Sequence, residues 1–400
     1  MRPVKYRALY LHIPFCRAKC LYCDFDSRAL IGCALEEAIS AYCEGLSAQV
    51  DAHGNAGELS EVETVYVGGG TPSLLGDRLV GLVDHVRAYC EPVEFTCEAN
   101  PESFTLDLAL ALRAAGVTRI SLGVQSLNAG ELKAIGRVHS AEQAMLAVAQ
   151  AKAAGFSTSC DVMCGLPGQT LDAFAETLRS LVTLNPDHVS VYPLQLEEGT
   201  PLARMEEAGE TEIPDEDFQA QCMDLAAEVL EEAGYERYEV ASYAKPGHRC
   251  RHNIAYWTGV PYLGLGRSAA SMCNLGKGAF LHMAEESAGV PKGRVPNGTP
   301  SGRVRFMQLD DAGKEFETEG LTAHEAMAED LMLACRMTDG ISPDLLACAA
   351  LAIPKDELFV ACERAVEKGL ATWDGGSLKP THLGWLEGNE LFGIFWDLAG

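Results

Sequence analysis

Three cysteines lie close together near the start of the chain, at Cys16, Cys20 and Cys23. Thiolates are the usual ligands of iron–sulfur clusters, and three of them on a four-iron cluster leave one iron with an open coordination position. Zinc is the alternative, although it requires a fourth protein ligand, for which His12 on the preceding segment is a candidate. The spacing therefore favours a [4Fe-4S] cluster over zinc or a chance grouping among the fifteen cysteines.

The cysteine triplet directly follows the first of several short apolar runs that are typical of β-strands. These runs begin near Ala8, Thr64, Glu94, Arg119, Ser157 and His188. The segments between them have helical periodicity, which is clearest in Leu171–Leu184. Strand–helix units in series predict a parallel sheet in an α/β fold, here a partial (β/α)6 barrel, because a complete TIM barrel needs eight units. Functional side chains are expected at the carboxyl ends of the strands.

The later part of the chain changes character. We expect the barrel over residues 1–240 and its remaining edge elements over residues 241–284. Residues 285–320 are rich in Gly, Pro and charged residues and are expected to form a connection. Residues 321–400 have a mainly helical pattern, with a short hairpin expected near Asp374-Gly375-Gly376, and predict a smaller C-terminal domain.

Composition limits the class of protein. A hydrophobic share of 48% is sufficient for a packed core, and a net charge of −26 argues against a broad nucleic-acid surface. Residues 322–400 carry 13 Asp and Glu against 5 Lys and Arg, a net charge of −8, which argues against DNA binding there. No apolar run could span a bilayer and no export signal is recognisable, so the many cysteines indicate a reducing compartment. We expect a cytoplasmic protein.

A glycine-rich segment, Gly68-Gly69-Gly70-Thr71-Pro72, follows the second expected strand. Glycines let the backbone approach a ligand closely, although a plain tight turn is the alternative. Together with the cysteine triplet after the first strand, this segment resembles the radical S-adenosylmethionine (SAM) superfamily. The string Tyr10-Leu-His-Ile-Pro-Phe-Cys16 narrows the resemblance to the oxygen-independent coproporphyrinogen III oxidases and their relatives. The resemblance covers nearly the whole chain apart from residues 285–320, and it implies that SAM chelates the open iron.

Polar residues end three successive expected strands, at Glu98, Gln125 and Asp161. Singly, each is more typical of a solvated or capping position, but together they predict a pocket at one rim. The resemblance implies that Glu98 and Asp161 bind the ribose of SAM, and that Gln125 and Arg137 lie near its methionine end. The complete set expected to bind SAM is Tyr10, Tyr22, Gly69, Gly70, Thr71, Glu98, Gln125, Arg137 and Asp161.

A second signature, His252-Asn-Ile-Ala-Tyr256-Trp257, lies later in the chain. From the residues alone, a core histidine beside a packed aromatic pair is the favoured interpretation. The segment also resembles the HNxxYW motif of the radical SAM heme chaperones, which implies that His252, Tyr256 and Trp257 contact heme. Imidazole ligates heme iron well, and His248 and Cys250 are alternative ligands.

Two departures bear on this resemblance. The oxidases have a fourth cysteine two positions after the triplet, where this chain has Phe25, and this favours the chaperone branch. That branch commonly has a histidine after the glycines near position 266, whereas this chain reads Arg267-Ser268-Ala269-Ala270-Ser271. The absence of that histidine weakens the chaperone assignment or indicates a divergent member.

Three functions are considered. The first is a heme-binding radical SAM protein that delivers heme to acceptor hemoproteins, with SAM and a [4Fe-4S] cluster as further cofactors. The second is a radical enzyme that acts on a porphyrin or another substrate and requires a reductant protein to cleave SAM. A structural metal protein without SAM chemistry ranks last. A homodimer is compatible with each of them.

Overall fold

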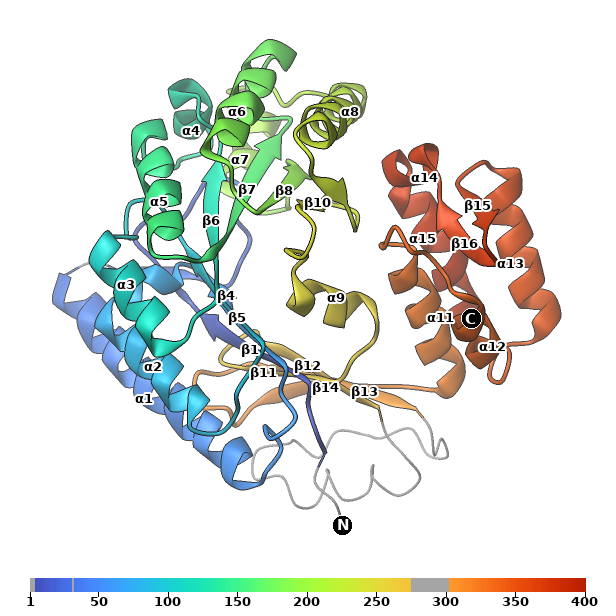
Figure 1. Ribbon diagram of the computed structural model, residues 1–400, viewed down its shortest axis with the longest axis horizontal. Coiled ribbons are helices and arrows are strands. Elements are labelled where there is room, and N and C mark those ends of the chain that lie inside the picture. The colour runs from blue at the N-terminus through green and yellow to red at the C-terminus, as the bar shows by residue number, and fades with distance from the viewer. Residues whose placement is uncertain (1–3, 31, 275–301) are drawn as a thin grey trace.

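The computed structural model describes residues 4–30, 32–274 and 302–400. Its centre is one sheet of twelve strands, with helices on its outer side and a smaller C-terminal body beside it (Figure 1). In spatial order the strands are β14 (Phe316–Leu321), β13 (Arg303–Gln308), β12 (Ala270–Asn274), β11 (Tyr262–Leu265), β1 (Ala8–Ile13), β4 (Thr64–Gly69), β5 (Glu94–Ala99), β6 (Arg119–Gln125), β7 (Ser157–Cys164), β8 (His188–Pro193), β10 (Ser242–Ala244) and β9 (Glu236–Arg237).

The middle of the sheet is parallel from β1 through β4, β5, β6 and β7 to β8. These strands are apolar and mostly buried because helices cover their outer face. The helices are α1 (Gly32–Asn55), α2 (Asp77–Arg87), α3 (Leu106–Ala115), α5 (Ala141–Ala153), α6 (Leu171–Leu184) and α8 (Glu216–Glu232). This arrangement confirms the predicted α/β fold with a partial (β/α)6 barrel.

Local sequence determines where these helices begin. Ser140 and Gln143 form a reciprocal capping box at the start of α5, and the Thr170 side chain accepts a hydrogen bond from the third residue of α6. Helix α6 ends at Asn185, whose left-handed backbone an asparagine tolerates well. The shorter elements are β2 (Phe15–Cys16), β3 (Arg28–Ala29), η1 (Pro72–Leu75), α4 (Ala129–Ala134), α7 (Pro201–Glu207) and α9 (Arg251–Trp257).

The sheet continues beyond the predicted barrel on both sides. Strand β11 pairs with β1 in parallel, and β12, β13 and β14 follow it as an antiparallel extension. Residues 302–320 are therefore not the connection that was expected, while residues 285–301 lie outside the described part of the chain. The alternation was hard to recognise because charged residues occupy these strands. Arg305 and Glu319 lie opposite each other as a cross-strand ion pair.

The C-terminal body has its own apolar core, built around residues such as Leu331, Ile341, Leu391 and Phe395. It consists of α11 (Ala323–Ala334), α12 (Pro343–Ala349), α13 (Lys355–Glu367), β15 (Ala371–Asp374), β16 (Ser377–Pro380), α14 (His382–Leu386), α15 (Gly388–Trp396) and the terminal turn η2 (Asp397–Ala399). The expected hairpin is present, with Asp374 paired to Ser377. No helix in the described ranges is long and apolar enough to cross a membrane.

Candidate cofactor and cluster site

The cysteine triplet lies in the loop between β1 and α1, beside the carboxyl end of the sheet. Cys16 is buried, whereas Cys20 and Cys23 are half-buried. All three residues line one cavity of about 460 Å³. The loop is held in place by short backbone bonds, including one from the Arg28 amide to the Pro14 carbonyl at 2.7 Å. The three thiols therefore face a common space.

His12 does not provide the fourth protein ligand that a single zinc ion would require at this loop. Within the described residues, no three side chains of His, Cys, Asp or Glu converge as they would around one metal ion. Cysteines that bind different irons of a cluster do not need to converge in that way. The suggested fourth zinc ligand is also engaged elsewhere, since His12 Nδ1 lies 3.0 Å from the Tyr10 hydroxyl and Nε2 lies 3.3 Å from the Asp26 carbonyl.

The glycine-rich segment packs directly against the cysteine loop. A Cβ atom on Gly70 would lie 2.6 Å from the Phe15 carbonyl oxygen and 2.9 Å from Cys16 Sγ, so no other residue fits there. The neighbouring Gly69 has a φ of +111°, and its amide donates to Glu98 Oε2 at 3.1 Å. The glycines therefore allow the glycine-rich segment, the cysteine loop and Glu98 to lie close together.

Two carboxylates face the cavity from β5 and β7, the strands on either side of β6. Glu98, near the end of β5, accepts hydrogen bonds from the Tyr66 hydroxyl at 2.8 Å and from the Gly69 amide. Burial raises the pKa of Glu98 to about 7. Asp161 on β7 lies 3.3 Å from the Ser121 hydroxyl, and burial raises its pKa as well. Both groups retain acceptor capacity for a ligand hydroxyl.

Arg137 and Gln125 complete the polar wall of the cavity. Gln125 follows a bulge in β6 and has a φ of +64°, an uncommon conformation that turns its side chain toward the cavity. The Arg137 guanidinium donates to Asn100 Oδ1 at 2.8 Å, to the Gly123 carbonyl at 2.7 Å and to Cys20 Sγ at 3.5 Å. Its buried Nε has no hydrogen-bond partner. The Arg137 cation therefore lies beside Cys20 and keeps one unused hydrogen-bond donor.

Most of the expected SAM-binding residues share this cavity. Its lining includes Tyr22, Gly69, Gly70, Glu98, Gln125, Arg137 and Asp161. Tyr10 and Thr71 do not line it. Tyr10 stacks on Tyr66 with ring centroids 6.2 Å apart, and Thr71 is buried behind the cavity, where its hydroxyl accepts from Asn100 Nδ2 at 2.9 Å.

Sequence reasoning missed several residues of the site. Asn100 links Arg137 to Thr71, and Tyr66 holds Glu98. Arg119 also lines the cavity, although it begins a buried strand and is itself buried. A charged residue at the start of an otherwise apolar strand was the available signal for Arg119.

The HNxxYW segment forms α9, which packs against the inner side of the sheet and contributes Asn253, but not His252, Tyr256 or Trp257, to the cavity lining. His252 is buried, with Nδ1 2.9 Å from the Thr64 hydroxyl and Nε2 3.1 Å from the Tyr256 hydroxyl. Burial and the Arg119 charge lower the pKa of His252 to about 3. Trp257 lies under the Arg336 guanidinium of the C-terminal body. In this arrangement His252 has no free nitrogen for heme iron and is a packed core histidine.

The alternative ligands near α9 are also engaged. The His248 Nδ1 atom lies 3.0 Å from the Ser157 hydroxyl. Cys250 is buried, with Sγ 3.4 Å from Asn253 Oδ1, and burial raises the pKa of its thiol to about 12. Neither residue lines the cavity.

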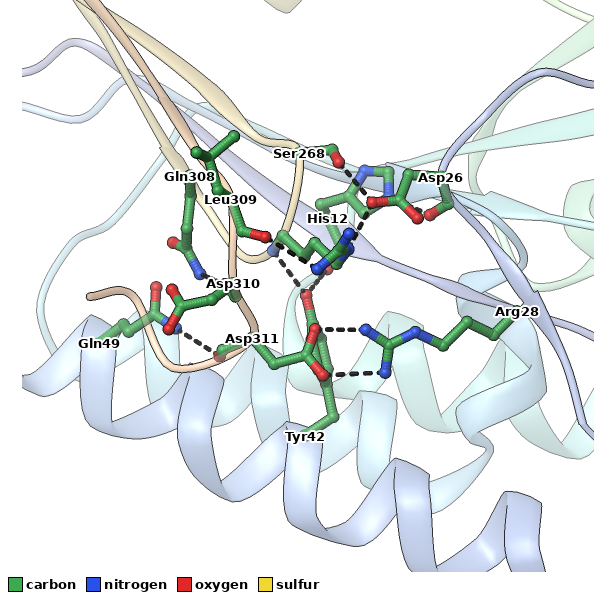
Figure 2. A network of polar contacts seen from close by, with 11 residues as sticks. His12, Asp26, Arg28, Tyr42, Gln49, Ser268, Gln308, Leu309, Asp310 and Asp311 are labelled. Atoms are coloured by element: carbon green, nitrogen blue, oxygen red, sulfur yellow. Dashed lines mark hydrogen bonds and ion pairs between the residues drawn. The ribbon is translucent and has the colours of Figure 1, made fainter. Parts of the chain in front are cut away.

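A network of ion pairs fastens the cysteine loop to the antiparallel extension of the sheet (Figure 2). Asp26, three residues after Cys23, accepts from Arg267 Nε at 2.5 Å and from the Ser268 hydroxyl at 2.7 Å. Two residues further on, Arg28 makes a bidentate pair with Asp311 at 2.8 and 2.9 Å. The run that lacks the histidine common in the chaperone branch thus anchors the loop that carries the cysteines.

Known proteins share both this sequence and this fold. The radical SAM superfamily profile matches residues 10–181. The heme chaperone HemW of Escherichia coli is 37% identical over 308 residues, which cover 76% of this chain and 78% of the relative. The heme chaperone HemW of Mycobacterium tuberculosis is 41% identical over 272 residues, which cover 65% and 68%. The solved coproporphyrinogen III oxidase of E. coli (HemN) superposes with a TM-score of 0.76 at 20% identity, over 98% of this chain and 91% of that chain.

The barrel, the cysteine loop and the matched profile define a radical SAM protein, a class whose cofactors are a [4Fe-4S] cluster and SAM. Within that class, the chain belongs to the heme chaperone HemW family, because the E. coli relative is 37% identical and is covered over 78% of its length. The likeness to the oxidase, at 20% identity, concerns the fold alone.

Proposed function

We propose that this protein is a heme chaperone that holds a [4Fe-4S] cluster on Cys16, Cys20 and Cys23, binds SAM beside it, and delivers heme to acceptor hemoproteins. The observation that supports the cofactor site is the single cavity that all three cysteines share with seven of the nine expected SAM-binding residues. The relatives' name, heme chaperone, supports the function.

Each polar group of the cavity would have a distinct task. The cluster, when bound, supplies an open iron and an electron for SAM. Glu98 and Asp161 would accept hydrogen bonds from the ribose hydroxyls, and the unpartnered Nε of Arg137 would attract the SAM carboxylate. Gly69 and Gly70 would admit the ligand close to their backbone. Burial of the site limits water and strengthens each of these interactions.

The chaperone is favoured over the oxidase. The cysteine loop carries Phe25 where the resembled oxidases have a fourth cysteine, and the fold likeness to the oxidase carries no activity with it. We expect purified protein to bind heme and, once loaded, to transfer it to apomyoglobin. We also expect no conversion of coproporphyrinogen III to protoporphyrinogen IX when SAM and a reductant are present.

The cluster is tested by anaerobic reconstitution. Changing Cys16, Cys20 and Cys23 together to Ala should abolish the visible cluster absorption, because too few thiolates remain. Single changes of Cys33, Cys43 or Cys90, which lie outside the cavity, are the matched controls and should leave the cluster intact. Iron retained by the triple variant would contradict the cluster site. Turnover of coproporphyrinogen, or no heme binding, would contradict the function.

A further inference from the structure

Two exposed aromatic side chains lie at the mouth of the cavity. Phe25 of the cysteine loop is 58% exposed, and Tyr192 near the end of β8 is 40% exposed, yet both line the same cavity as the cluster cysteines. Met163 and Pro193 belong to the same lining, and Leu196 is exposed just beyond it. These side chains form an apolar rim, which we define as Phe25, Tyr192 and Leu196.

The rim differs chemically from the interior of the cavity. The interior carries buried or half-buried polar groups such as Glu98, Arg119 and Asp161, which suit a nucleoside with hydroxyls and charges. The rim offers aromatic faces to solvent, and large exposed aromatics beside a cavity are typical of a binding surface. The interior of the cavity and its rim therefore offer surfaces that suit two chemically different ligands.

Resting on the proposed function, we infer that heme binds flat against the Phe25, Tyr192 and Leu196 rim, at the mouth of the SAM cavity and not on His252, Tyr256 or Trp257 of the HNxxYW segment. Aromatic faces suit a planar apolar macrocycle. No histidine among the described residues lines the cavity, and both ring nitrogens of His252 are engaged inside the protein. Heme is therefore bound by stacking on the aromatic rim, without axial ligation of its iron by His252.

The charges around the rim orient the ligand. Lys19 is exposed, lines the cavity, and donates from Nζ to the Phe25 carbonyl at 2.8 Å, which holds its cation next to the Phe25 backbone. Asp24 and Glu197 also line the cavity, and their carboxylates repel the propionates. The two propionates of heme should therefore point toward Lys19 and away from the acidic residues. A one-sided, solvent-facing site of this kind also leaves heme accessible to an acceptor protein.

The first experiment is anaerobic titration of the full-length, cluster-loaded protein with heme. Changing Phe25 and Tyr192 together to Ala should weaken heme binding by about tenfold or more, because two stacking surfaces are lost. SAM binding and cluster absorption should change by no more than about twofold. Phe359 and Trp373 are exposed aromatics of the C-terminal body, and their Ala variants are the matched controls. His252→Gln should retain heme binding, and iron-free protoporphyrin IX should bind about as tightly as heme.

The second experiment tests orientation. Lys19→Gln should weaken heme binding by about threefold to tenfold but should leave binding of heme dimethyl ester, which lacks free carboxylates, unchanged. Unaltered heme affinity in the Phe25/Tyr192 variant, or loss of heme on His252→Gln with the cluster intact, would overturn the rim site while leaving the chaperone function standing. Failure of the unaltered protein to bind any heme would overturn the proposed function itself.

Discussion

Two regions of this protein contain buried arginines, and the two differ in whether the guanidinium nitrogens have hydrogen-bond partners. At the junction with the C-terminal body, Arg303 is only 2% exposed in relative accessibility, and its guanidinium binds Glu329 at 2.5 Å, Asp330 at 2.6 Å and Asn274 at 3.2 Å. At the cavity, Arg119 is 3% exposed and makes no ion pair within 4 Å in the described part of the chain, and its Nε has no partner. Arg137 also keeps an unpartnered Nε there.

The difference separates structural charge from charge that awaits a ligand. A buried guanidinium whose three nitrogens all have partners fixes one element against another, here β13 against α11. A buried guanidinium with unused donors costs free energy in the protein without ligand. An anionic or polar ligand that accepts hydrogen bonds from these donors offsets that cost. Arg119 and Arg137 each keep an unpartnered Nε in the lining of one cavity, which supports the role of that cavity as the cofactor site.

Removing the paired arginine should produce the largest effect on folding. Arg303→Leu leaves the half-buried Asp330 without a counter-charge, while Glu329 retains its contact with Arg305. We expect a loss of about 3 kcal/mol in unfolding free energy, measured by thermal unfolding. Arg78→Gln breaks an exposed pair with Glu36 and is the control, with an expected loss below about 1 kcal/mol. Equal losses in the two variants would remove the distinction between the regions.

Much of this organisation could be predicted from the sequence. The alternation of apolar runs and helical segments determines the parallel sheet, and parallel strands bring Glu98, Gln125 and Asp161 to one edge. The cysteine spacing is local and predicts its chemistry without knowledge of the fold. The prediction of the fold is confirmed because each strand and helix is encoded locally, whereas the cluster on the three cysteines stays a prediction.

Other features depend on residues that are distant in the sequence. His252 contacts the hydroxyl of Thr64, which lies 188 positions away, and this contact occupies its Nδ1 atom. Asp26 is held by Arg267, which lies 241 positions away. Strands β13 and β14 were missed because their charged residues are neutralised across the hairpin, as in the pair of Arg305 and Glu319. No local pattern records which side chains will meet.

The carboxylates of the cavity should show an intermediate effect. Glu98→Gln or Asp161→Asn should weaken SAM binding by about 1–3 kcal/mol, because a charged acceptor is lost while the cluster still assembles. The pKa of Glu98 is raised to about 7, so its carboxylate is progressively protonated below that pH. SAM affinity should therefore fall as the pH drops from 8 to 6, and Glu98→Gln should flatten this dependence. Anaerobic calorimetry measures both, and a pH profile unchanged in the variant would exclude Glu98 from the pocket.

The smallest effect is expected where the sheet extension holds the cysteine loop (Figure 2). Asp311→Asn replaces a carboxylate by an amide and weakens the bidentate pair with Arg28, while the Asp26 contacts with Arg267 and Ser268 remain. Arg28 and Asp311 are partly exposed, so the loss should be about 0.5–1 kcal/mol. This corresponds to cluster release to a chelator that is faster by about twofold to fivefold.

Two further measurements distinguish a specific role of the Arg28–Asp311 pair from a general loosening of the hairpin. One varies the ionic strength, and the other breaks a neighbouring ion pair. Screening weakens ion pairs, so the difference between Asp311→Asn and the unaltered protein should shrink at high ionic strength. Glu319→Gln breaks the exposed pair with Arg305 on the same hairpin without touching the cysteine loop, and it should not accelerate cluster release. If both variants release the cluster at the same rate, the hairpin acts as a whole and the Arg28–Asp311 pair has no specific part in retention. If only Asp311→Asn is faster, and only at low salt, the cysteine loop is held electrostatically by a part of the sheet outside residues 10–181, the range that the radical SAM profile matches.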